Sequence, residues 1–292
     1  MKVRKGPDGI HLFDRDSGTN VLIDEYIPPA TSWTNCPRQV SIALTNACDL
    51  KCIHCYASKQ AAWLSKEYVK KWMIELDKAG CFGIGFGGGE PTLHPNLVEL
   101  CQFGIEETGL AISLTTHGHK LDEGLIFQLK NFIRVSMDGV GQTYESIRGR
   151  PFEDLKQNLS FLKGQIPFGI NYVVNHRTIN DLDVAAQVAE VNGATELLLL
   201  PEEPFGLGKE IDVLTFARLQ KWITYYKGNL RLSISSRYQE KLDTLVTLKN
   251  EPDHLAFAHI DAKGVLKRTS FDKVGYDIGN SELLTIFQNF CV

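Results

Sequence analysis

Three cysteines in one short stretch are the part of this sequence best suited to chemistry. Cys48, Cys52 and Cys55 follow one another with the spacing Cys-x₃-Cys-x₂-Cys. Thiolates are soft ligands that favour iron–sulfur clusters, zinc and cuprous copper. A four-iron cluster normally takes four cysteines, so three would leave one iron open to a small molecule.

A zinc site and chance spacing are the alternatives to a cluster at these cysteines. Structural zinc usually takes four ligands arranged in two short pairs, and the sequence lacks a second pair. His54 directly precedes Cys55, so the two are poorly placed to bind the same ion. The chain has seven cysteines in all, so some close spacing arises by chance. The pattern fits neither zinc nor disulfide spacing, and we therefore favour the cluster.

The cysteine spacing resembles the signature of radical S-adenosylmethionine enzymes. The resemblance implies that Cys48, Cys52 and Cys55 hold one [4Fe-4S] cluster, whose open iron is chelated by S-adenosylmethionine. Reductive cleavage of that cosubstrate then gives a 5′-deoxyadenosyl radical, which abstracts hydrogen from a substrate. The family favours an aromatic residue just before the third cysteine, close to the adenine. His54 stands there instead and is our expected adenine contact.

A glycine-rich segment follows the second predicted strand. Its residues Gly88, Gly89, Glu90 and Pro91 match the Gly-Gly-Glu-Pro segment with which the family binds the methionyl amine. Glycine permits close backbone approach, and the glutamate offers a negative charge to an ammonium group. Residues 83–88 also fit G-x-G-x-x-G, the dinucleotide fingerprint. That fingerprint must open a helix at once, whereas this stretch overlaps a strand and two prolines follow, so we reject it.

Polar residues end the third predicted strand. Thr115 and His117 share a face with Ser113, by the alternation of a strand. The family often has Thr-Thr-Asn-Gly here, contacting the cosubstrate; Thr115 fits, and His117 replaces the asparagine. A polar strand end that simply faces water is the alternative.

The fourth predicted strand ends in Ser136 and Asp138, which share a face and can reach ribose hydroxyls. Relatives carry Val-Ser-x-Asp-Gly at this place, and the serine contacts the cosubstrate. Arg148 lies ten residues beyond Asp138. Arginine grips carboxylates with two parallel bonds, so the resemblance assigns Arg148 to the methionyl carboxylate. Arg150 is the alternative, and surface pairing is open for both.

Four further residues are candidates for substrate contact by position alone, because they follow the fifth and sixth predicted strands. They are Tyr172, Asn175, His176 and Glu202. A solvated loop or an internally satisfied hydrogen bond is an equal alternative for each.

From residue 39 the chain alternates apolar strand runs with amphipathic helices. The expected strands cover residues 40–44, 81–86, 110–115, 132–137, 168–174 and 197–200. The expected helices cover residues 65–79, 95–108, 124–129, 152–162, 181–191 and 213–226. Six strand–helix units predict an α/β fold with a parallel sheet, specifically a partial (β/α)6 TIM-like barrel. The resemblance implies the same core, and it places ligands at the carboxyl ends of the strands.

We expect three parts along the chain: an N-terminal arm with a β-hairpin (1–38), the partial barrel (39–235) and a small C-terminal cap (236–292). The cap should contain a hairpin, with strands at residues 254–261 and 265–270, and a final helix at residues 281–290. Relatives that modify peptides often carry auxiliary clusters in such a cap. Here only Cys291 lies in the tail, and Cys81 and Cys101 are expected in the core. We therefore expect a single cluster and favour redox-neutral chemistry or a reaction completed by an external reductant.

Composition and charge narrow the partners. The formal net charge is −4, which gives no electrostatic argument for nucleic acid. The N-terminus lacks the apolar run of a signal peptide, and no stretch is long and apolar enough for a membrane helix, so we expect a cytoplasmic protein without a membrane partner. The resemblance implies an external electron donor of flavodoxin or ferredoxin type.

The sequence favours a radical enzyme acting on a ribosomal peptide or protein, because the arm and cap resemble parts of peptide-maturing relatives. A small metabolite is the alternative substrate, since the arm is short for a leader-peptide domain. A zinc-stabilised binding protein and a relative that binds the cosubstrate without cleaving it are the alternative functions. Fold alone does not choose among them.

Overall fold

A computed structural model describes residues 1–129, 132–242 and 248–290. By its internal contacts the chain divides into two compact units. Unit 1 comprises Met1–Ala47, Gln60–Ser113 and Thr247–Val292; unit 2 comprises Cys48–Lys59 and Leu114–Val246. The cysteine loop therefore belongs to unit 2, and the glycine-rich segment belongs to unit 1. Each unit is described by itself.

The main sheet of unit 1 is built around β4 (Gln39–Thr45), which is buried along most of its length. It pairs in parallel with β5 (Gly83–Gly88) on one side and with β11 (Phe257–Ile260) on the other. Beyond β11 the sheet continues through the antiparallel strands β12 (Val265–Lys267) and β13 (Tyr276–Asp277). The C-terminal segment thus extends the same sheet that carries the first two strand–helix units.

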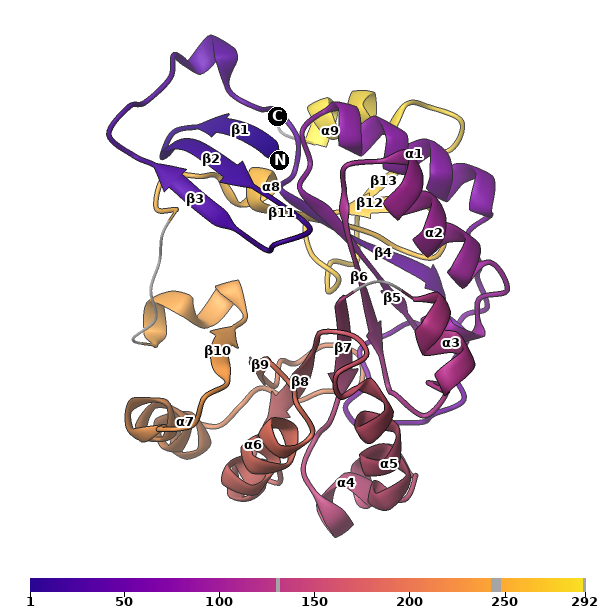
Figure 1. Cartoon of the computed structure of the whole chain (residues 1–292), viewed down its shortest axis with the longest axis vertical. Helices are drawn as coiled ribbons and strands as arrows, with labels where there is room; N and C mark the ends of the chain where they lie inside the picture. Colours follow the sequence, from indigo (N-terminus) through magenta and orange to yellow (C-terminus); the bar gives the residue numbers. More distant parts are fainter. Residues whose placement is uncertain (130–131, 243–247, 291–292) are drawn as a thin grey trace. The chain divides into compact units, whose positions relative to one another are not determined.

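Helices α1 (Lys66–Lys78) and α2 (Leu97–Glu107) lie side by side next to this sheet (Figure 1). The N-cap of α1 is Ser65, whose side chain accepts a hydrogen bond from the backbone N–H of Tyr68. The buried stripe of α1 has helical spacing and consists of Val69, Trp72, Met73 and Leu76. The short helices α8 (Asp253–Ala256) and α9 (Leu283–Phe290) complete the described part of this unit.

The N-terminal arm is a three-stranded antiparallel sheet of β1 (Lys2–Gly6), β2 (Gly9–Phe13) and β3 (Asn20–Ile23). It is joined to the rest of unit 1 by polar contacts at both of its turns. Asp8 accepts hydrogen bonds from the backbone N–H groups of Lys249 and Asn250. Arg15 donates to the carbonyl oxygens of Ile105, Thr108 and Leu110 at the end of α2.

Unit 2 contains a parallel sheet of β7 (Phe132–Ser136), β8 (Phe168–Val174), β9 (Glu196–Pro201) and β10 (Arg231–Ile234). Strand β6 (Ala111–Thr116) starts in unit 1, ends in unit 2 and is next to β7 in the strand order. The helices are α3 (Glu123–Gln128), α4 (Gly141–Arg148), α5 (Phe152–Leu162), α6 (Leu182–Val191) and α7 (Val213–Tyr225).

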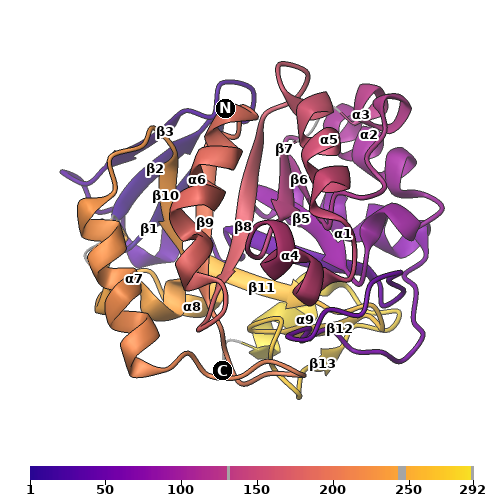
Figure 2. The ribbon, with the colours of Figure 1, turned by 90° about the horizontal axis from the view of Figure 1, so that it is seen from below.

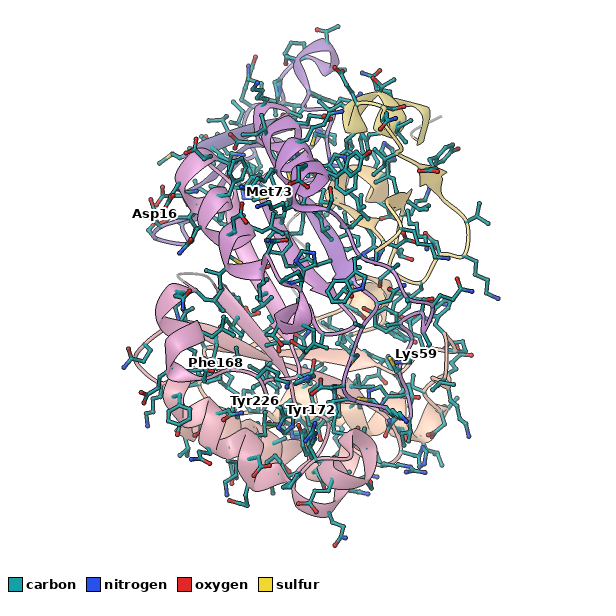
Figure 3. The ribbon with its side chains drawn as sticks, turned by 90° about the vertical axis from the view of Figure 1, so that its right-hand side faces the viewer. Asp16, Lys59, Met73, Phe168, Tyr172 and Tyr226 are labelled. Carbon is teal, nitrogen blue, oxygen red and sulfur yellow. The ribbon has the colours of Figure 1, made fainter. Side chains whose placement is uncertain are left out.

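Helices α4, α5 and α6 pack on one face of the sheet of unit 2 (Figure 2). Phe168 and Tyr172, both from β8 and labelled in Figure 3, are completely buried. Asn171 of β8 alternates with these residues and therefore lies on the other face of the sheet. It is half-buried, as is its register partner Ser136 of β7. Among the described residues the strand order ends at β13 in unit 1 and at β10 in unit 2, so the sheet does not close into a ring.

The α/β fold with a mostly parallel, unclosed sheet is confirmed. All six predicted strands and all six predicted helices exist, and none of their ends differs from the prediction by more than two residues. Cys81 and Cys101 are completely buried, as predicted. Cys291 lies outside the described residues. The three-part division of the chain stays a prediction.

Several features differ from the prediction. Pro95 precedes the N-cap Asn96 instead of opening α2, because Pro91 and Pro95 hold this stretch in a 3-10 turn and a loop. Strands β1, β10 and β13 and helix α4 were not predicted. Helix α4 was missed because Gly139 precedes its N-cap Val140 and Gly141 is its first residue, and two glycines so close together are typical of a loop. Both glycines have positive φ.

Candidate cluster and cosubstrate site

The cysteine loop follows β4 directly and has no regular secondary structure. The backbone N–H of Cys55 donates to the carbonyl oxygen of Cys52 across 3.2 Å, which closes a tight turn between them. Cys52 is buried, with 7% of its surface exposed, while Cys48 and Cys55 are half-buried. The loop thus has one buried thiol, Cys52, and two partly exposed thiols, Cys48 and Cys55.

Each of the three sulfur atoms receives an N–H donor. The backbone N–H of Leu50 lies 3.4 Å from Cys48 Sγ, and Lys59 Nζ lies 3.2 Å from Cys55 Sγ; Lys59 is labelled in Figure 3. Arg148 Nη1 lies 3.5 Å from Cys52 Sγ. Metal-ligating cysteine is a thiolate, and donors of this kind compensate its charge. The donor set therefore fits an iron–sulfur cluster.

Within the described residues, no three histidine, cysteine or carboxylate side chains are gathered around the position of a single metal ion. Burial raises the pKa of the Cys52 thiol, and the positive charge of Arg148 acts in the opposite direction. A metal-ligating thiol is deprotonated, and the positive charge of Arg148 favours that form at Cys52.

Asp138 is fully buried at the carboxyl end of β7 and is held from three sides. Its Oδ1 accepts the backbone N–H of Val173 across 2.8 Å. Its Oδ2 lies 3.2 Å from His54 Nε2 and also accepts a bond from Arg148 Nη2. Burial by itself raises the pKa of Asp138, but the charge of Arg148 and the contact with His54 hold it well below its usual range. Asp138 is therefore an anion at neutral pH.

This arrangement joins three of the predicted site residues into one group: His54, Asp138 and Arg148. Both oxygens of Asp138 are engaged within the protein, so its predicted contact with a ribose stays a prediction. Arg148 has both Nη atoms engaged, while its buried Nε and the buried Nδ1 of His54 have no hydrogen-bond partner among the residues that the structure describes.

A second ionic group ties the cysteine loop to the end of β6. His117 Nε2 lies 2.8 Å from Asp49 Oδ1. His117 Nδ1 accepts the backbone N–H of His119 across 3.0 Å, so its Nε2 carries the hydrogen and donates it to Asp49. Arg150 lies 3.4 Å from the same carboxylate, at Oδ2. Sequence reasoning missed Asp49, although its place directly after Cys48 was a possible signal.

In the glycine-rich segment of unit 1, the backbone of Gly88 and Gly89 packs directly against the backbone of residues 45–47. Gly88 has φ +123°, and a Cβ there would lie 2.3 Å from the carbonyl oxygen of Thr45. A Cβ on Gly89 would lie 2.2 Å from the carbonyl oxygen of Ala47, the residue just before Cys48. Glu90 is almost fully buried, and its Oε1 accepts from the N–H and hydroxyl of Thr92. Only glycine fits at the first two positions.

The predicted substrate contacts are not brought together. The hydroxyl of Tyr172 donates to the carbonyl oxygen of Thr178 across 2.7 Å, under the helices. Asn175 Oδ1 accepts two backbone N–H groups of its own turn, from Arg177 and Thr178. Glu202 Oε1 accepts the backbone N–H of Lys209, and His176 is exposed. Tyr172, Asn175 and Glu202 therefore make hydrogen bonds within the protein. An internally satisfied hydrogen bond was the alternative to substrate contact in the sequence analysis.

The loop after β9 also touches the cysteine loop and was not predicted. The backbone N–H of Leu207 donates to the carbonyl oxygen of Cys55 across 3.1 Å. Gly206 has φ +59°, and a Cβ there would lie 2.5 Å from Tyr56 Cα. Loop 202–212 therefore supports the third cysteine through close backbone contact.

The sequence matches the model of the Radical SAM superfamily over residues 42–189, half of the chain. The chain belongs to this superfamily of enzymes, which use a [4Fe-4S] cluster and S-adenosylmethionine. No helix among the described residues is long and apolar enough to cross a membrane.

Among curated relatives, the chain is 29% identical over 204 residues to an AdoMet-dependent heme synthase of Methanosarcina barkeri, covering 65% of this chain and 58% of the relative. It is 31% identical over 186 residues to a probable GTP 3′,8-cyclase of Saccharolobus solfataricus, covering 59% of each. The chain thus spans about three fifths of the length of these two relatives.

Among solved structures, Streptococcus suis SuiB bound to S-adenosylmethionine matches 99% of this chain and 88% of its own, with a TM-score of 0.79 and 13% identity. The peptide-bound enzyme anSMEcpe matches 86% and 80%, with a TM-score of 0.66 and 19% identity. These similarities support the partial-barrel fold.

Proposed function

We propose that this chain binds a [4Fe-4S] cluster through Cys48, Cys52 and Cys55 and cleaves S-adenosylmethionine reductively. The observation that carries the proposal is that all three sulfurs of the loop accept an N–H donor, from Leu50, Arg148 and Lys59. When bound, the cluster and cosubstrate together supply a 5′-deoxyadenosyl radical for hydrogen abstraction. The chain's own residues hold, orient and shield them.

Each proposed cosubstrate contact has a chemical reason. The charge of Glu90 suits the methionyl ammonium, and the missing side chains at Gly88 and Gly89 leave backbone groups accessible. Thr115 and Ser136 are half-buried hydroxyls on the face of their strands away from the helices. His54 has a buried Nδ1 without a hydrogen-bond partner in the described part of the chain, and this atom can hydrogen-bond a purine. His117 has a supporting role through Asp49.

Anaerobic reconstitution tests the cluster. The parent chain should bind about four irons per chain and release 5′-deoxyadenosine in the presence of dithionite and S-adenosylmethionine. Joint replacement of Cys48, Cys52 and Cys55 by alanine should remove the iron. Cys101→Ala, at a thiol buried in α2, is the control and should keep it. Retention of iron by the triple variant would show that other residues are the ligands.

We further propose a ribosomal peptide or protein as the substrate and an external flavodoxin- or ferredoxin-type electron donor. The support for the peptide is the whole-chain fold similarity to SuiB, a structure of which contains the precursor peptide SuiA. A small metabolite is the second candidate, because the curated relatives include a heme synthase and a probable GTP cyclase.

Substrate-dependent formation of 5′-deoxyadenosine separates the two candidates. Synthetic peptides encoded by short reading frames beside the gene should raise the rate above the substrate-free level and should change mass. GTP should leave the rate unchanged. A rate increase with GTP and none with the peptides would favour the metabolite.

A further inference from the structure

Arg148, the last residue of α4, contacts a carboxylate and a candidate cluster ligand with the two arms of one guanidinium. Nη2 donates to Asp138 Oδ2, and Nη1 lies 3.5 Å from Cys52 Sγ. The Arg148 side chain is 11% exposed and that of Asp138 is fully buried. A fixed cation therefore lies against the most buried of the three sulfurs.

We propose that Arg148 sets the reduction potential of the cluster by donating an N–H···S hydrogen bond to Cys52, while Asp138 holds its guanidinium in place. This inference rests on the proposed function, because it requires the cluster to be bound at the cysteine loop. Arg148 is then a positioning residue that acts through Cys52.

The physical reason is the distribution of charge on the ligand sulfur. A hydrogen bond to a ligand thiolate withdraws electron density from it and makes the reduced cluster less unfavourable, which raises the potential. The effect is larger in a dry site, where charges are weakly screened. Asp138 has little freedom, since the N–H of Val173 and the ring of His54 hold its two oxygens.

The sequence predicted that Arg148 binds the methionyl carboxylate, and its contacts in the structure separate that role from an effect on the cluster potential. A bidentate grip uses two N–H groups of the guanidinium that point the same way. Here Asp138 and Cys52 each occupy one Nη, and the remaining Nε is buried. An effect on the cluster without cosubstrate is therefore expected.

The test is a redox titration of the reconstituted full chain without S-adenosylmethionine. Arg148→Lys retains the positive charge and can pair with Asp138, but one nitrogen on a flexible stem does not reproduce the planar fork whose two terminal nitrogens contact Asp138 and Cys52 Sγ. We expect the same iron content as in the parent and a more negative midpoint potential. Arg150→Lys is the matched control, since Arg150 pairs with Asp49; its potential should equal that of the parent.

A spectroscopic measurement on the parent tests the same hydrogen bond without a variant, and it therefore applies even if Arg148→Lys fails to fold. With ¹⁵N-labelled arginine, the reduced cluster should show a weak hyperfine coupling to an arginine nitrogen, and Arg150→Lys should keep it. Its absence from the parent would overturn the inference. An unchanged potential in a folded, iron-loaded Arg148→Lys, with only its affinity for S-adenosylmethionine reduced, would also overturn it. A parent that binds no cluster would instead refute the proposed function.

Discussion

His117 at the end of β6 donates a hydrogen bond to Asp49 in the cysteine loop, with 2.8 Å between Nε2 and Oδ1. The direction of this bond is fixed, because His117 Nδ1 already accepts the N–H of His119. The His117 side chain is only 3% exposed. This bond therefore fastens the residue after Cys48 to the sheet of unit 2.

His117→Phe should loosen the cysteine loop, because it keeps a ring of similar size and removes the donor to Asp49. A hydrogen bond to a charged group contributes about 1.5–3 kcal/mol. The same energy corresponds to a factor of roughly ten to one hundred, so we expect a chelator to strip iron from the variant faster by about that factor. His176→Phe, at an exposed histidine of the same unit, should leave the rate unchanged. Equal rates in both variants would show that the bond does not support the loop.

Glu90→Gln should weaken the binding of S-adenosylmethionine while the iron content stays at the parent level. The substitution removes the negative charge but keeps an oxygen to accept from Thr92. The expected loss is about 1.5–3 kcal/mol, the contribution of a charge-assisted bond. Equilibrium binding to the loaded protein measures it. Glu99→Gln, at an acid of unit 1 that pairs with Lys66 and Lys70, is the control. Unchanged affinity in Glu90→Gln would remove Glu90 from the site.

Gly206→Ala should disturb the cysteine loop through the loop after β9. The new Cβ would lie 2.5 Å from Tyr56 Cα and 2.6 Å from the carbonyl oxygen of Cys55. Gly164→Ala provides a close control, because Gly164 also has positive φ but nothing within 4 Å of the new Cβ. Iron retention should fall in the first variant and not in the second. A similar result for both would mean that backbone strain alone, and not the contact with Cys55, explains the loss.

Stability of the chain should depend on the protonation of His259, which is buried in β11 beside Ser41. Burial lowers the pKa of His259 to about 4, from an ordinary 6.5. Between these values the unfolded chain binds a proton that the folded chain does not, so this contribution is complete above pH 6.5 and is lost as the pH falls towards 4. Its full size is on the order of 3 kcal/mol.

Urea unfolding at about pH 7.5 and about pH 5.5, on either side of the ordinary histidine pKa, measures this dependence. The free energy of unfolding should fall with acid in the parent, and it should fall less in His259→Gln, whose amide keeps a partner for Ser41 without titrating. His254→Gln, at a histidine that is not fully buried, is the control and should behave like the parent. An equally steep fall in His259→Gln would assign the acid sensitivity to other groups.

The sequence alone determined the order of the strand–helix units and singled out the cysteine loop as the candidate cluster site. Both are local properties: ligand spacing lies within a few residues, and the periodicity of apolar residues reports which face of each element is buried. The match of Gly88, Gly89 and Glu90 to a family segment was also visible in sequence. The structure adds the physical reason for the glycines, namely the carbonyl oxygens of Thr45 and Ala47 against their backbone.

The tertiary structure decided which partners the polar residues take. Asp138 and Arg148 were expected to meet the cosubstrate separately, but an unpredicted helix, α4, brings Arg148 back onto Asp138 and Cys52. Tyr172, Asn175 and Glu202 were candidates by position, yet each bonds to its own turn. The pairing of β11 with β4 joins residues more than two hundred positions apart. Contacts of this kind depend on how elements pack, and no local pattern in the sequence specifies them.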